Sequence, residues 1–129
     1  MMRYKDFTEM PTWKLAYKLS LRIYEITSTF PLEEKYGLVS DMRRAANSIS
    51  NNLAEGFGRF EAYDKTRFYK ISRGSCYELM NQSMLSEGLK FMDTKVKDEI
   101  LNTCEEIIKG LDSMIKTIET TRGQYKKRK

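Results

Sequence analysis

The sequence contains no histidine, and this absence removes most of the enzyme designs open to a small helical protein. Ser-His-Asp and Cys-His arrangements need an imidazole, as do the Glu-x-x-His motifs of di-iron and di-manganese bundles. Neighbouring acids such as Glu33 and Glu34 diverge by about 100° on a helix and form no catalytic pair. We therefore expect a protein that is not an enzyme and that has no cofactor, metal site or small-molecule substrate.

Cysteine, proline and long apolar runs are also scarce. Cys76 and Cys104 are far apart in the sequence and belong to no CxxC motif, so we expect two buried free thiols. We find neither a membrane-spanning run nor a secretory leader, and expect a cytoplasmic protein. The two prolines, Pro11 and Pro31, and the lack of a Gly/Ser linker predict a compact fold with short loops.

The apolar residues recur at the three- and four-residue spacing of amphipathic helices, and no segment shows the alternation of a strand. We predict an all-α fold, an antiparallel up-down-up-down four-helix bundle. It forms one domain of residues 1–123, followed by a basic C-terminal tail at 124–129. The predicted helices cover residues 12–29, 33–57, 64–91 and 93–121.

The third of these helices carries two apolar stripes. One, which includes Ile71, Leu79, Leu85 and Leu89, is assigned to the core. A soluble monomer seldom exposes a second stripe, so we expect the other to form a subunit interface. The alternative is a wider monomer core, or surface aromatic residues covered by the N-terminal arm. The predicted interface residues are Tyr69, Cys76, Met80, Met84 and Phe91.

Residues 43–59 read RRAANSISNNLAEGFGR, a helix whose polar side is rich in serine and asparagine. These are weaker helix formers than lysine or glutamate, which suggests that packing or a partner constrains the face. Arg44, Ser48, Asn51 and Glu55 follow one another at helical spacing and share that face. Two interpretations remain open: an intramolecular network with Arg44 and Glu55 paired across the bundle, or contact with another molecule.

Basic residues gather in two further places. The last four residues supply four of the net +5 charges, so the rest of the chain is nearly neutral. The other cluster surrounds the start of the third helix and is interleaved with Tyr63 and Tyr69, a combination that can hold phosphates and stack on bases. An ordinary charged helix face is the alternative. The candidate nucleic-acid contacts are Arg59, Arg67, Lys70, Arg73, Lys126, Lys127, Arg128 and Lys129.

Three segments resemble the bacterial 23S rRNA intervening-sequence protein family: WKLAYKLSLRIYEITSTFP, EKYGLVSDMRRAANSISNNLAEGFGR and RFYKISRGSCYEL. The resemblance implies a four-helix bundle that assembles as a homopentameric ring, some members being encoded within 23S rRNA gene insertions. A related group assists the reverse transcriptases of diversity-generating retroelements and binds nucleic acid. The family motif falls on Arg43, Arg44, Ser48, Asn52, Glu55, Gly56 and Arg59, with Gly74, Ser75 and Glu78 on the third helix. Ser50 and Leu53 depart from it, standing where the family has proline and isoleucine.

These patterns together predict a homo-oligomeric protein, expected to be a pentamer, that acts by binding. RNA or a nucleic-acid-handling protein is the expected partner, and no membrane contact is expected. The alternative is a protein-partner or assembly scaffold without nucleic-acid contact, such as a reverse-transcriptase accessory protein.

Overall fold

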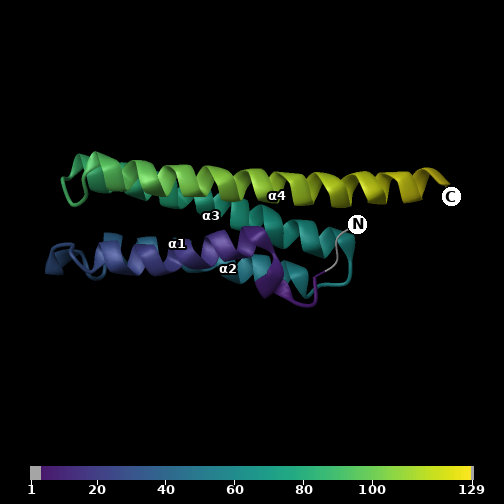
Figure 1. The fold of residues 1–129 in the computed structure, drawn as a ribbon, viewed down its shortest axis with the longest axis horizontal. Coiled ribbons are helices and arrows are strands. Elements are labelled where there is room, and N and C mark those ends of the chain that lie inside the picture. The colour runs from purple at the N-terminus through teal and green to yellow at the C-terminus, as the bar shows by residue number, and fades with distance from the viewer. Residues whose placement is uncertain (1–3, 129) are drawn as a thin grey trace.

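Four long helices form a bundle in the computed structural model, which describes the backbone of residues 4–128 and the side chains of residues 4–121 (Figure 1). No strand occurs within that part of the chain, so the predicted fold class is confirmed. Two short 3-10 helices, η1 (Phe7–Glu9) and η2 (Leu32–Glu34), precede the first two long helices. The long helices are α1 (Pro11–Thr27), α2 (Leu38–Phe57), α3 (Ala62–Gly88) and α4 (Thr94–Arg128).

The helix boundaries differ most from the predicted ones at the start of α2 and at the end of α4. Glu33 and Glu34 belong to η2, and α2 begins only at Leu38, whose backbone N–H donates to the Glu34 carboxylate at 3.2 Å. α4 does not end at Gly123 but runs to Arg128, since one glycine costs a helix only about 1 kcal/mol. Most of the predicted tail is therefore helical backbone, and Lys129 lies outside the described residues.

The four long helices occupy the corners of a square. α1 and α3 each pack against α2 and α4, whereas α1 and α3 do not contact each other within residues 4–128. Figure 1 shows α4 extending past the other helices, at the end where the α2–α3 turn also lies. None of the helices in the described part of the chain is long and apolar enough to cross a membrane.

α2 and α3 make the most extensive contact, and small hydroxyl side chains lie between them. The Ser72 hydroxyl is fully buried and donates to the carbonyl of Ile49 at 2.8 Å. Ser83 and Ser86 are also fully buried and donate to carbonyls one turn earlier in α3. Because each buried hydroxyl has an acceptor, these small residues let the helices approach without leaving a polar group unpaired.

The apolar stripe of α3 that faces the core is not the one that was predicted to do so. Tyr69 is 3% exposed and Cys76 fully buried, so assigning them to a face outside the core was wrong. Met80 and Phe91 pack against the core, whereas Met84 is exposed. Of the predicted core stripe only Leu79 is buried. The other three members lie on the surface: Ile71, Leu85 and Leu89.

Candidate binding surfaces

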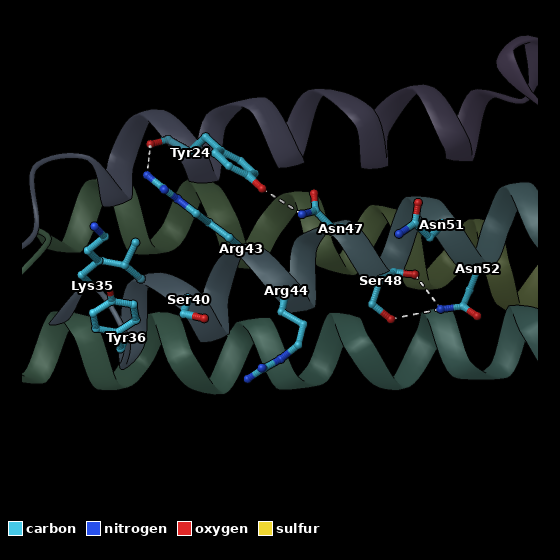
Figure 2. Close-up of a pocket in the computed structure, with 11 residues that line it drawn as sticks. Tyr24, Lys35, Tyr36, Ser40, Arg43, Arg44, Asn47, Ser48, Asn51 and Asn52 are labelled. Carbon is cyan, nitrogen blue, oxygen red and sulfur yellow. Dashed lines mark hydrogen bonds between the residues drawn. The ribbon is translucent and has the colours of Figure 1, made fainter.

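A groove of about 640 Å³ runs along the outward face of α2, with α1 and α3 on either side (Figure 2). Polar and cationic side chains dominate its lining, and five of them belong to the face and motif predicted from the sequence. A smaller pocket, lined in part by Glu55 and Phe68, adjoins it at Asn51 and Asn52. The groove is lined by Tyr24, Lys35, Tyr36, Val39, Ser40, Arg43, Arg44, Asn47, Ser48, Asn51 and Asn52.

Arg43 attaches α2 to α1. Its guanidinium lies 4.5 Å from the centre of the Tyr24 ring, and its Nε donates to the Thr27 hydroxyl at 3.0 Å. The Tyr24 carbonyl accepts a further bond from Arg43 at 3.3 Å, and the Tyr24 hydroxyl accepts one from Asn47 at 2.9 Å. Arg43 and Asn47 therefore have a structural role, as Figure 2 shows, while a positive charge remains at the groove.

Ser48 and Asn52 belong to a network inside the molecule. The Ser48 hydroxyl lies 2.8 Å from that of Ser75 in α3, within hydrogen-bonding distance. The Asn52 amide donates to the Ser48 carbonyl at 2.8 Å and to its hydroxyl at 3.0 Å. Ser48, Asn52 and Ser75 therefore bond to one another within the molecule.

Arg44, Asn51 and Glu55 instead face solvent. Arg44 pairs with Asp41 of the same helix and its side chain is 71% exposed. Glu55 pairs at 3.3 Å with Arg59, which lies just beyond the C-terminus of α2. The expectation that Arg44 and Glu55 pair across the bundle is therefore wrong, and these side chains can contact another molecule.

Gly56 is a packing residue. A Cβ at this position would lie 2.6 Å from Cε1 of Tyr69 and 3.2 Å from the carbonyl oxygen of Lys65, so only glycine fits without rearrangement. The Lys65 ammonium donates to the carbonyls of Gly56 and Phe57 at 3.2 and 2.8 Å, and burial lowers its pKa. Lys65 thus caps the C-terminus of α2, a role the sequence analysis missed although lysine is favourable at helix ends.

The predicted basic cluster divides into two parts. Lys70 and Arg73 point to α4, where Glu119 and Asp112 accept their bonds at 2.9 and 2.6 Å. Those ion pairs offset their charges. Gly74 and Glu78 of the motif are exposed. The side chains of Lys126, Lys127 and Arg128 lie outside the described residues.

The remaining cations meet at the α2–α3 turn. The guanidinium groups of Arg59 and Arg67 lie 4.8 and 4.5 Å from the centre of the Phe68 ring. Phe60 is 99% exposed and Tyr63 is also exposed. We call Arg59, Phe60, Tyr63, Arg67 and Phe68 the turn cluster. Phe60 was not among the predicted contacts, although an apolar residue in a polar turn is a visible signal in the sequence.

The described residues contain no group of three or more Cys, Asp or Glu side chains placed to hold a metal ion. What they present is hydrogen-bonding and stacking surface, in a groove and at a turn. The fold and these surfaces define a four-helix-bundle protein with an extended polar face along α2.

The family model of the 23S rRNA-intervening sequence protein matches residues 8–113, so the chain belongs to that family and the resemblance is confirmed. A solved structure from Bacteroides thetaiotaomicron is similar, with a TM-score of 0.73 and 19% identity over 81% of this chain and 98% of that chain. It is described as a protein with unknown function from the S23 ribosomal protein family, and at this identity the likeness shows the fold alone. No curated protein matches the chain.

Proposed function

We propose that this protein is a non-enzymatic, homo-oligomeric binding protein whose ligand is structured RNA. The observation that carries the proposal is the turn cluster, where two arginines and exposed aromatic rings occur together. Membership of a family described by 23S rRNA supports the choice of RNA.

The turn cluster has the chemistry that single-stranded segments and loops of RNA require. Guanidinium groups bind phosphates, and exposed aromatic rings stack on unpaired bases. Arg67 makes no ion pair with a carboxylate among the described residues, so its charge is available to a phosphate. Phe60 offers a ring that no neighbouring side chain covers.

The position of the cluster also suits a polyanion. The α2–α3 turn lies at the end of the bundle toward which the C-terminal part of α4 runs (Figure 1), and the sequence there is rich in lysine and arginine. The rest of the chain is nearly neutral, so one copy offers only a modest charge. Several copies in one oligomer multiply that affinity because one RNA can contact them together.

The test is the salt dependence of RNA binding, measured by fluorescence anisotropy with a labelled structured RNA. Phosphate contacts release counterions, so the affinity should fall linearly with salt on a double-logarithmic plot. Arg67→Gln should reduce that slope, and Phe60→Ala should weaken binding about 5- to 100-fold at every salt concentration if the ring stacks on a base. Lys109→Gln, the same charge change at an exposed position of α4, is the control. RNA binding that both turn variants leave unchanged, or no salt-dependent binding at all, would rule out the proposal.

The groove favours a second candidate, a scaffold that binds a protein partner. Arg44 and Asn51 offer exposed hydrogen-bonding groups beside the structural network of Ser48, an arrangement that suits an extended peptide backbone. A partner that stays bound after nuclease treatment and is lost on Asn51→Ala, but not on Lys109→Gln, would support this candidate over RNA.

A further inference from the structure

The groove along α2 continues into the turn cluster. Asn51 and Asn52 line both the groove and the smaller pocket, and that pocket is also lined by Phe68, a member of the turn cluster. Figure 2 shows Lys35 and Tyr36 at the opposite end of the groove from those two asparagines. A continuous hollow, which we call the α2 path, therefore runs from Lys35 to Phe68.

The lining of the α2 path is positively charged, since three of the described residues along the groove are cationic and none is acidic. Lys35 makes no ion pair with a described residue, and the bonds of Arg43 go to neutral oxygens of α1. The ion pair of Arg44 is exposed, and such pairs contribute little, so a phosphate can replace its partner. In the smaller pocket Glu55 lies 3.3 Å from Arg59, which offsets its charge. The path therefore attracts an anion along its length.

Hydrogen-bonding groups without partners also line the α2 path. The side chains of Ser40 and Asn51 make no bond to another described residue. Asn52 donates to Ser48, but its amide oxygen accepts no bond from the described residues. Such side chains bind the sugar hydroxyls and base edges of an unpaired RNA strand. The path can therefore bond to a strand as well as attract it.

Each end of α2 carries an exposed aromatic ring directly after a cation. Before the helix, Tyr36 follows Lys35 and is 87% exposed. After the helix, Phe60 follows Arg59 and is 99% exposed. Unpaired bases stack on such rings, while the adjacent cations bind the neighbouring phosphates. Because α2 has 20 residues, the two stacking positions lie about 30 Å apart along the helix.

We infer that the α2 path holds the sugar–phosphate backbone of an unpaired RNA strand, which stacks one base on the turn cluster and another on Tyr36. The inference rests on the RNA binding proposed above and extends it from the turn to the whole length of α2. At the ~3.4 Å per nucleotide of a stacked strand, about nine nucleotides cover this length. A peptide backbone is uncharged, whereas every nucleotide carries a phosphate, so the cationic lining favours the RNA strand over the peptide considered above.

Two oligouridylates of different length test the path, with binding measured by fluorescence anisotropy. One has about ten nucleotides and can reach both rings, whereas the other has about three and is too short even at twice the stacked spacing. Tyr36→Ala should weaken binding of the longer strand about 5- to 100-fold and leave the shorter strand unaffected, because the turn cluster holds it. Phe60→Ala should weaken binding of both strands. Lys35→Gln should lower the salt slope for the longer strand by about 0.7, the value for one phosphate contact of a single strand.

Matched controls make the same changes outside the α2 path. Tyr77→Ala and Lys109→Gln alter exposed residues of α3 and α4, and both variants should bind the two strands as the unsubstituted chain does. Lys35 and Tyr36 are exposed, so their variants should keep the helical content and the urea midpoint. Sedimentation should give both variants the mass of the unsubstituted chain. A lower mass would assign the groove to a contact between copies and overturn the inference.

Each alternative result has a separate meaning. If Tyr36→Ala and Lys35→Gln bind the longer strand normally while Phe60→Ala binds it weakly, the inference is overturned and the proposed function stands. Equal weakening of both strands by Tyr36→Ala would indicate a separate site at that end and overturn the path. A nuclease-resistant protein partner that Tyr36→Ala releases, with RNA affinity unchanged, would assign the groove to that partner. The absence of salt-dependent binding to any RNA would contradict the proposed function and this inference together.

Discussion

The hydroxyls of Ser48 in α2 and Ser75 in α3 lie 2.8 Å apart, and their hydrogen bond joins the two helices that make the most extensive contact. Ser75 can also donate to the Ile71 carbonyl at 3.2 Å, and Asn52 donates to Ser48. The polar face of α2 is thus divided: one part holds α3 in place, and the other, with Arg44 and Asn51, faces solvent.

Removing either hydroxyl should destabilise the fold. We expect Ser48→Ala and Ser75→Ala each to lower the free energy of unfolding by about 0.5–1.5 kcal/mol, since each leaves a partly buried partner without its bond. The double variant should lose less than the sum, because both changes break one interaction. Urea unfolding measures all three. Ser50→Ala is the control, as Ser50 bonds only within its own helix, to Asn47. Strict additivity of the two single changes would show that the bond does not couple the helices.

The contact between Gly56 and Tyr69 leads to a second prediction. Gly56→Ala should destabilise the protein by about 1–3 kcal/mol, because the new methyl group would overlap the Tyr69 ring. The same change should cost less in a Tyr69→Leu background, where the overlapping ring atom is gone. Gly88→Ala is the control, since a Cβ there meets nothing within 4 Å. Thermal unfolding of the four variants separates overlap from a general intolerance of alanine.

The sequence was sufficient to predict the number of long helices and the fold class. Helical periodicity is strong in α1, α2 and α4, where large apolar residues define one stripe. In α3 the buried positions include Thr66, Ser72, Ser83 and Ser86, so its most apolar stripe is not its buried one. Periodicity alone assigns such a helix wrongly, because it does not show that close contact with α2 requires small residues.

Only part of the candidate site could be predicted, because helical spacing does not show which residues of the neighbouring helices lie opposite. Helical spacing correctly placed Arg44, Ser48, Asn51 and Glu55 along one face. It did not show which of them would find partners, because that depends on the opposite helix: Ser48 meets Ser75, whereas Arg44 finds its acid in α2. The acids of α4 that offset Lys70 and Arg73 are far away in the sequence and only the fold brings them there.

The two cysteines give a third prediction. Cys76 and Cys104 are both fully buried, and the hydrogen bond with Cys76, together with burial, raises the pKa of the Cys104 thiol well above its usual range. We expect both thiols to resist an aromatic disulfide reagent in the folded protein. They should react at least about 10³-fold faster in urea, since reaction in water must await rare unfolding. Fast labelling of one thiol without urea would show that α3 and α4 separate locally.

The alkaline limit of stability should depend on Tyr69. Burial raises the pKa of its phenol to about 12, whereas an unfolded tyrosine titrates near pH 10. Its neutral form therefore contributes stability that is complete below about pH 10 and is lost as the pH rises toward 12, by up to about 2–3 kcal/mol. Tyr69→Phe carries no ionisable phenol, so its free energy of unfolding should decline less than that of the unsubstituted chain between pH 9 and 11.5. Urea midpoints at the two pH values measure the difference, and other alkaline titrations cancel in the comparison. An equal decline in both proteins would mean that the Tyr69 hydroxyl reaches water in solution, and with it that the contact between α3 and Gly56 opens.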